Sequence, residues 1–294
     1  AIDAGLLHPS FATGDPISVA LGAVQHTDFL FAGAGAPTNL EAGLRLNLVS
    51  GIRQPYGAQE VTDSRRAAWY SLAFLLRTVA SAALDIQPLE LAAGIYSGVT
   101  GSEPATYAFL ADTLENGAGF STQLGSPGFL PEFLRAVDSY LAELEDPSHT
   151  KVCSSSCYRC LRDYGNMAYH ALLDWRLARD LFRLLQGLPL IIDEAAETAA
   201  IDRWAQAYNA APISSVVPAA RYNSPSAGSF AVIARHAFEA SEDTLIAPRL
   251  AEAMAEIESS EEDLDGVVFV DSFTLDRDPR RVLKLISDSE LAGA

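Results

Sequence analysis

Hydrophobic residues follow two different spacings along the chain, and their alternation predicts an α+β protein. After Ser64, apolar positions recur at helical spacing through Ala68, Leu72, Leu75 and Val79, and this pattern ends at Pro88. Short apolar runs bounded by glycine, proline or polar residues are typical of strands. By these criteria further helices are expected at 131–144, 167–186, 198–208, 248–259 and 279–286. Strands are expected at 17–24, 27–32, 89–99, 106–114, 230–235 and 266–273.

These elements predict a small mixed sheet packed by long helices, followed by a smaller C-terminal α/β region. The character of the chain changes after Gly187, where prolines interrupt a looser stretch. Such punctuation is common between domains. We therefore expect one domain over residues 1–187, with a cysteine-rich loop embedded in it, and a C-terminal extension over residues 188–294.

The composition is that of a soluble globular protein. The chain has 294 residues, of which 49% are hydrophobic, and a mean hydropathy of +0.12. No apolar run approaches the roughly 18–20 residues that a membrane-spanning helix needs, and no basic-then-apolar leader is evident. A cytoplasmic protein without a membrane partner is expected. Because the chain begins at Ala1 rather than at methionine, we also expect it to be part of a longer protein.

The charge is unevenly distributed. A net charge of −18 argues against a surface built for unspecific attachment to phosphates, which requires an excess of Lys and Arg. Between residues 151 and 183, however, the sequence contains six cationic residues and only three aspartates. Between residues 239 and 265, ten acids accompany a single cation, Arg249. The first region is locally basic, and the second is expected to be a solvated acidic face or a protein-docking surface.

All three cysteines of the chain, Cys153, Cys157 and Cys160, lie within eight residues. The last two form a Cys-x2-Cys pair, whose spacing lets two sulfurs reach one tetrahedral metal ion from a single tight turn. In a reducing compartment, clustered cysteines in odd number favour metal ligation or redox chemistry over a disulfide framework. The alternative is that they are three small buried apolar residues.

Motifs for other chemistry are missing from the sequence. There is no Gly-x4-Gly-Lys-Ser/Thr phosphate loop and no Gly-x-Ser-x-Gly elbow, so neither ATPase nor hydrolase activity is assigned to this chain. Gly117 and Gly119 lie in a glycine-rich turn, which is more often a tight turn than a phosphate cradle. Asp112 before that turn is more often a turn or capping acid than a catalytic one.

The cysteine region as a whole resembles a known family. The block Cys-Tyr-x-Cys-Leu-x-x-Tyr-x-Asn at 157–166, with Asp112, Gly117 and Gly119 upstream, resembles the MrfA-type zinc-binding domain over roughly residues 17–185. That domain lies at the C-terminus of superfamily-two DNA helicases, among them the mitomycin repair helicase and the anti-phage helicases of DISARM and Druantia, and also occurs in a helicase-less DISARM partner subunit. The resemblance implies a structural Zn²⁺, a DNA partner, and a helicase motor in cis or in a partner subunit.

The chain departs from this family at one ligand. The mitomycin repair helicases use a fourth cysteine shortly after the Cys-x2-Cys pair, where this chain has Tyr164 and Gly165. A structural zinc site with three ligands would remain open. Either a histidine completes it, or zinc is bound weakly or is absent. His170 is favoured by its place at the start of the helix predicted at 167–186, and His149 by its position four residues before Cys153. The third reading is that His170 is a hydrogen-bonded core histidine.

Aromatic and cationic residues alternate around the cysteines. Tyr158, Arg159, Arg162 and Tyr164 combine groups that stack on bases with groups that pair with phosphates, as in single-stranded nucleic-acid binding. Two hypotheses follow. The chain is a zinc-stabilised accessory domain that handles single-stranded DNA or a strand junction and assembles a helicase complex in anti-phage defence or DNA repair. Alternatively, it is a protein-interaction module with a structural metal and no nucleic-acid contact.

Overall fold

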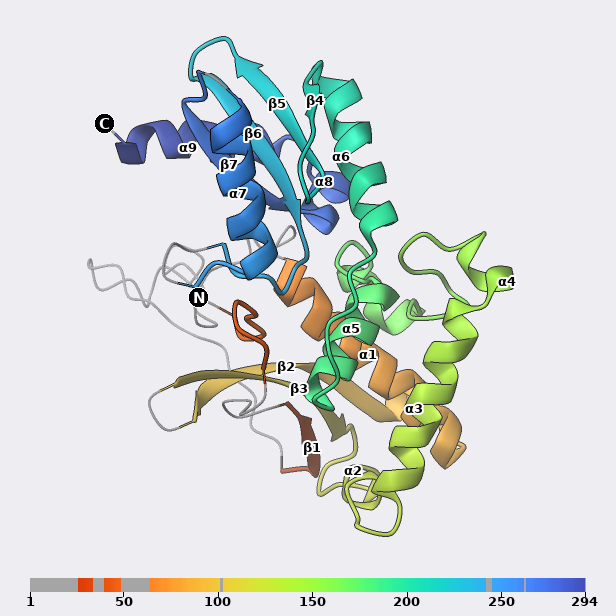
Figure 1. The fold of residues 1–294 in the computed structure, drawn as a ribbon. Coiled ribbons are helices and arrows are strands. Elements are labelled where there is room, and N and C mark those ends of the chain that lie inside the picture. Colours follow the sequence, from red (N-terminus) through yellow and green to blue (C-terminus); the bar gives the residue numbers. More distant parts are fainter. Residues whose placement is uncertain are drawn as a thin grey trace, which may run out of the picture.

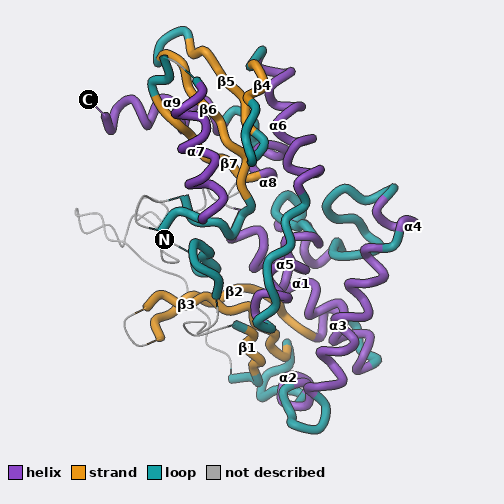
Figure 2. Tube along the Cα trace, in the orientation of Figure 1, coloured by secondary structure: helices purple, strands orange, loops and turns teal. Residues whose placement is uncertain are grey.

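The computed structural model describes residues 26–33, 40–48, 64–100, 103–241, 245–261 and 263–293. Within these ranges the chain has an α+β fold with two separate sheets (Figure 1, Figure 2). This confirms the predicted fold class. The strand expected at 17–24 lies outside the described residues.

A three-stranded antiparallel sheet in the order β1-β3-β2 forms one side of the first half. Its strands are β1 (Phe29–Ala32), β2 (Leu91–Thr100) and β3 (Glu103–Asp112). Side chains alternate between its two faces, so that Ala108 and Leu110 are buried against α1 (Ser64–Leu84). On the opposite face, Phe29, Phe31 and Tyr96 are about half exposed, at 49%, 50% and 51%.

Helix α1 is the centre of the first core. Helices α3 (Leu130–Glu145) and α5 (Trp175–Leu185) pack against it. By length and composition α1 resembles a membrane-spanning helix, but 78% of its most apolar window is buried inside the fold, as expected of a core helix. Short elements complete this half: η3 (Pro88–Glu90), α2 (Phe120–Leu124), α4 (Pro147–Thr150) and η4 (Tyr164–Tyr169).

The second half contains a four-stranded sheet in the order β4-β5-β6-β7, in which only the β6–β7 pair is parallel. Its strands are β4 (Ala211–Ile213), β5 (Ala219–Ser224), β6 (Gly228–Arg235) and β7 (Gly266–Asp271). Helix α7 (Pro248–Ser260) connects the parallel pair and covers one face through Ile233. Helices α6 (Glu194–Tyr208), α8 (Ser272–Arg277) and α9 (Arg281–Gly293) cover the other face. The mixed strand pairing is therefore in the second sheet.

Three local expectations differ from the structure. The helix predicted at 167–186 begins only at Trp175, because Asp174 accepts a hydrogen bond from the backbone N–H of Arg176 and caps α5 there. The strand predicted at 266–273 ends at Asp271, whose side chain caps α8 in the same way. The stretch after Gly187, expected to be loose, contains the short strands β4 and β5.

The two halves share buried surface. Ala237, Phe238 and Phe273, from the second half, belong to the core formed around α1. A β-bridge joins Leu44 to Glu239, and His236 hydrogen-bonds Asp180 of α5 at 3.1 Å. The boundary at residue 187 thus stays a prediction, and the two parts of the chain pack on each other through apolar contacts.

A buried ion-pair cluster ties α7 to its neighbours. The Arg249 guanidinium binds both oxygens of Glu239 and both oxygens of Glu197, at 2.6–3.0 Å. The two carboxylates are only 3% and 4% exposed. Burying two carboxylates is costly unless a cation compensates them, so Arg249 is the residue that makes this arrangement stable.

Candidate metal centre

The cysteine loop folds back on itself next to α4. Cys157 and Cys160 are joined by a tight turn in which the N–H of Cys160 donates to the Cys157 carbonyl at 3.1 Å. Cys153 lies three residues after the end of α4, and its backbone N–H donates to the carbonyl of His149 at 3.0 Å. These two turns bring one imidazole nitrogen and three sulfurs within 4.8 Å of one another. This His/Cys3 cluster can hold a metal ion such as zinc.

The distances inside the cluster fit one tetrahedral ion. The Sγ atoms of Cys153 and Cys160 are 3.9 Å apart, and Cys157 Sγ lies 3.7 Å from His149 Nε2. Tetrahedral zinc, with bonds of about 2.3 Å to sulfur and about 2.0 Å to nitrogen, places two sulfurs about 3.8 Å apart and a sulfur and a nitrogen about 3.6 Å apart. The donor set and these two distances therefore suit a tetrahedral zinc ion.

The imidazole of His149 is oriented as in a metal ligand. Its Nδ1 lies 2.8 Å from the Leu144 carbonyl, which can only accept, so Nδ1 carries the proton. The other ring nitrogen, Nε2, faces Cys157 Sγ at 3.7 Å and is the atom within reach of a metal ion. A backbone carbonyl that fixes the imidazole in this way is the usual outer contact of a zinc-bound histidine. The ring is 4% exposed and packs edge-on against Trp175, with centroids 5.7 Å apart.

The three thiols differ in acidity. Burial raises the pKa of Cys153 and of Cys160. Burial also disfavours the Cys157 thiolate, but hydrogen bonds led by the backbone N–H of Arg159 outweigh it and lower its pKa to about 7. Cys157 is therefore the first thiolate available to a metal at neutral pH, and a bound cation would favour ionisation of the other two.

The loop is held in place by contacts from several elements. The Tyr140 hydroxyl of α3 donates to the Cys160 carbonyl at 2.9 Å, and the N–H of Trp175 donates to the Ser155 carbonyl at 2.9 Å. Arg162 donates through Nε to the Ser156 hydroxyl, also at 2.9 Å. The ligand geometry thus depends on the packing of α3 and α5 as well as on the loop.

His170, the other candidate ligand, lies elsewhere. It follows η4 instead of starting a helix, and its Nε2 lies 2.9 Å from Asn166 Oδ1 and 3.1 Å from the Asp163 carbonyl. Asn166 is fully buried and also donates to the Leu161 carbonyl at 2.8 Å. His170 therefore belongs to the hydrogen-bonded turn that follows the cysteines, and the cluster is completed by His149.

The four residues predicted to bind nucleic acid differ in their exposure to solvent. Tyr158 and Tyr164 are 60% and 84% exposed, with ring centroids 5.9 Å apart, and Tyr158 also meets the His170 ring edge-on. Arg159 is also exposed and lines a pocket with Tyr140 and His149, whereas Arg162 is half-buried and donates a hydrogen bond to Ser156. Tyr158, Arg159 and Tyr164 are the exposed residues of this predicted set, and we call these three residues the loop surface.

Asp112 and the glycine turn are structural partners. The buried Asp112 carboxylate accepts hydrogen bonds from the backbone N–H groups of Ala118, Phe120 and Ser121, and from the Ser121 hydroxyl, at 2.7–3.0 Å. Gly117 and Gly119 have φ of +75° and +85°, and a Cβ at Gly117 would lie 2.6 Å from Asp28 Oδ2. The turn therefore requires both glycines, and its N–H groups are occupied by Asp112 instead of a phosphate.

Replacing Asp112 by asparagine is expected to destabilise the protein by about 3 kcal/mol at pH 7, because buried N–H donors lose a charged acceptor. Burial alone would raise the pKa of Asp112, but the hydrogen bonds from Ser121, Ala118 and Phe120 lower it overall. A lowered folded-state pKa gives stability that is present above about pH 4 and lost as the pH falls through the folded value. Urea unfolding of both proteins should show their difference shrinking below pH 4; a constant difference would contradict this role.

The sequence offered no signal for several supporting contacts. The carbonyl of Leu144, the hydroxyl of Tyr140 and the caps at Asp146 and Asp174 all come from residue types that are common in helices and turns. Asn166 was visible only as one position of the Cys-Tyr-x-Cys block. The buried Asn166 side chain accepts from the backbone N–H of Asp163 and donates to the Leu161 carbonyl, which requires an amide.

Comparisons with protein-family models, with curated proteins and with solved structures return no match to this chain. The functional interpretation therefore depends on the geometry of the cluster and of its surroundings.

Proposed function

We propose that this chain is a zinc-stabilised accessory module that binds single-stranded DNA for a helicase, whose motor lies outside it. The main support for this proposal is the His/Cys3 cluster, in which the Leu144 carbonyl orients His149. The exposed loop surface belongs to the same cysteine loop. The resemblance of the cysteine block to the MrfA-type domain of DNA helicases supports the helicase connection. It also favours a role in anti-phage defence or DNA repair.

The proposed role of zinc is structural. His149, Cys153, Cys157 and Cys160 supply four ligands, and four protein ligands leave no open position for substrate or activated water. The metal would join α4 to the Cys-x2-Cys turn, and its binding free energy would become folding free energy of the loop.

The loop surface has the chemistry for single strands. Exposed tyrosines stack on any base, and Arg159 with the exposed Lys151 can pair with phosphates. Because the whole chain carries a charge of −18, attraction for DNA has to be local, and few phosphates would be contacted. We expect weak binding with a small dependence on salt.

A second candidate function is docking of a basic protein. The exposed side chains of α7 include Glu252, Glu256 and Glu258, which form part of the acidic region between residues 239 and 265. This surface would serve complex assembly and is compatible with DNA binding at the loop.

A titration of fluorescent oligo-dT with the metal-loaded protein tests the first proposal. Tyr164→Ala should weaken binding at least about fivefold, since one stacked base contributes about 1–3 kcal/mol. Arg159→Gln should reduce the slope of log affinity against log salt by about 0.7, the value for one lost phosphate contact on a single strand. Arg280→Gln, an equal charge change at an exposed turn in the second half, is the matched control.

The proposal would be overturned by either of two results. One is the absence of any binding at low salt. The other is the same affinity and salt slope for the Arg159, Tyr164 and Arg280 variants. In that case docking of a protein to the acidic surface becomes the better account.

A further inference from the structure

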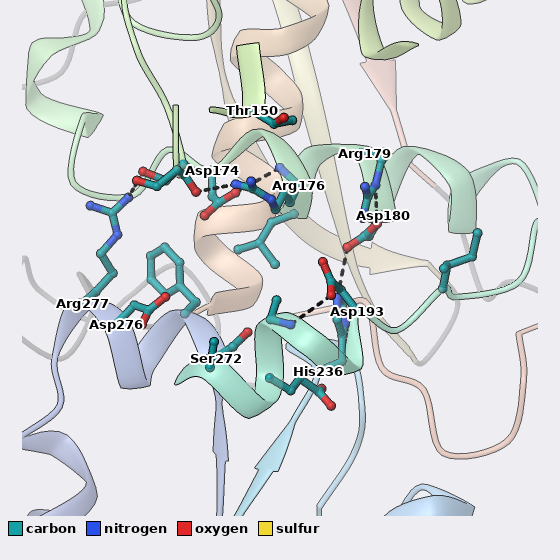
Figure 3. A pocket seen from close by; sticks show the side chains of 18 of the residues that line it. Thr150, Asp174, Arg176, Arg179, Asp180, Asp193, His236, Ser272, Asp276 and Arg277 are labelled. Atoms are coloured by element: carbon teal, nitrogen blue, oxygen red, sulfur yellow. Dashed lines mark hydrogen bonds and ion pairs between the residues drawn. The ribbon is translucent and has the colours of Figure 1, made fainter. Parts of the chain in front are cut away.

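A polar cleft lies between the cysteine loop and the second half of the chain. It has a volume of about 680 Å³ and is lined by α4, the cysteine loop and α5 on one side and by α6 and α8 on the other (Figure 3). This volume is within the range of roughly 300–1,000 Å³ typical of small-ligand sites. The cleft is separate from the metal ligands, none of which lines it.

Most charges in the cleft already have partners. Asp180 pairs with Arg179 at 2.8 Å, and Asp276 pairs with Arg203 at 2.7 Å. Glu197 is bound by Arg249 in the buried cluster described above. These three carboxylates are compensated. Asp193 also lines the cleft and has no ion pair in the part of the chain that the structure describes; its side chain caps α6 by accepting from the N–H of Ala196.

Of the four arginines that line the cleft, Arg176 and Arg277 form no ion pair with any residue that the structure describes. Arg176 donates to the Ser154 carbonyl and stacks on Trp175, with its Cζ 4.5 Å from the ring centroid. Arg277 donates to the Ser155 hydroxyl at 2.6 Å. Both hydrogen bonds go to neutral acceptors, so each guanidinium keeps spare donors, although the Asp174 carboxyl lies between the two groups and interacts with both charges.

Four hydroxyl-bearing residues also contribute to the cleft, and one of them, Ser155, contacts Arg277 through its hydroxyl. The side chains of Thr150, Ser154, Ser155 and Ser272 also line the cleft. Guanidinium groups combined with hydroxyl donors are the set that recognises a tetrahedral phosphate, whose oxygens accept several hydrogen bonds at once. A carboxylate ligand would use fewer of these donors.

We propose that this cleft binds the phosphate group of a nucleotide, with Arg176 and Arg277 as its ligands. The nucleotide is either free or part of the single strand; the second case rests on the proposed function. The arginines come from different halves of the chain, α5 and α8, so an occupied cleft would fasten the cysteine loop to the second sheet. Nucleotide binding and the packing of the two halves would then be coupled.

Asp174 limits the affinity of this site. In Figure 3 it lies between Arg277 and Arg176. Burial raises the pKa of Asp174 to about 6, against the opposing effect of Arg176 and Arg277 and with the support of the nearby Asp180. At pH 7 the carboxyl is mostly ionised and repels a phosphate. Asp174→Asn removes that charge and retains an acceptor for the helix cap, and should tighten binding severalfold.

Calorimetry on the metal-loaded chain with thymidine monophosphate, thymidine and oligo-dT tests this proposal. The monophosphate should bind at least about tenfold more tightly than thymidine, which lacks the phosphate. Arg176→Gln and Arg277→Gln should each lose at least about tenfold in affinity for the monophosphate. Arg203→Gln is the matched control, because Arg203 lines the cleft but is paired with Asp276.

The metal content of each variant shows whether the cysteine loop is intact. The Arg277 variant is the more direct test, because Arg277 lies in α8, outside that loop. Equal affinity for thymidine and its monophosphate, or equal losses in the Arg277 and Arg203 variants, would overturn the proposal. Monophosphate binding without oligo-dT binding would support a free-nucleotide site and contradict the proposed function. Loss of oligo-dT binding on changing Tyr164, with monophosphate binding retained, would support both.

Discussion

Replacement of Cys160 by serine is expected to reduce the metal content from about one zinc per chain to near zero. A serine hydroxyl does not replace a thiolate as a zinc ligand, and three remaining ligands hold the ion weakly. Structural zinc contributes about 10–16 kcal/mol of apparent binding free energy in small domains, so its loss should unfold the loop. Elemental analysis gives the metal content. Fluorescence of Trp175, which packs against His149, reports on the loop.

Two histidine variants make this experiment decisive. His149→Ala should lose the metal as Cys160→Ser does, whereas His170→Ala should retain it and lose only the hydrogen bonds to Asn166 and Asp163. A metal-free wild-type protein would contradict the zinc assignment altogether. Loss of zinc from the His170 variant alone would show that the fourth ligand is wrongly assigned.

Replacement of Arg249 by methionine is expected to destabilise the protein by about 3–5 kcal/mol. The change keeps most of the apolar length of the side chain but leaves Glu197 and Glu239 buried without a cation. Urea unfolding followed by circular dichroism measures the loss. Fluorescence of the buried Trp204 in α6 shows whether the second half is affected first.

Arg203→Met provides the comparison for this cluster. The Arg203–Asp276 pair is also close, at 2.7 Å, but its side chains are 59% and 47% exposed. Exposed pairs contribute about 0–1 kcal/mol, so this variant should be nearly as stable as the wild type. Similar losses in both variants would mean that burial of the two glutamates is not what makes Arg249 important.

The cysteine cluster could be predicted because metal ligation depends on short sequence spacing. Cys153, Cys157 and Cys160 reach each other through local turns, which a sequence displays directly. The choice between the two histidines could not be made in this way. It depends on Asp146, which caps α4, and on the Leu144 carbonyl, which orients the ring.

Two of the three differences in secondary structure, at the starts of α5 and α8, originate in capping. Leu173, Leu177 and Leu181 are buried with helical spacing, so the apolar pattern continues across the start of α5. The helix nevertheless begins at Trp175, because Asp174 provides the cap. Periodicity records which residues face the core, whereas caps decide where an element starts.

The long-range ion pairs lie beyond what the sequence reveals. The segment 239–265 was expected to be a solvated acidic surface, yet Glu239 is buried against Arg249, the single cation of that segment. Its other partner, Glu197, is 52 residues away along the chain. Pairings of this kind depend on how α6 and α7 cover opposite faces of the second sheet.

The core shared by the two halves has a consequence for synthesis of the protein. Residues up to about 187 leave the ribosome before Ala237, Phe238 and Phe273 have been made, and these three side chains complete the packing around α1. The first half would therefore present uncovered apolar surface while residues 188–273 are translated, which is the situation that favours chaperone capture or aggregation. Nascent chains arrested before Phe273 should accordingly be more sensitive to protease than chains arrested after it.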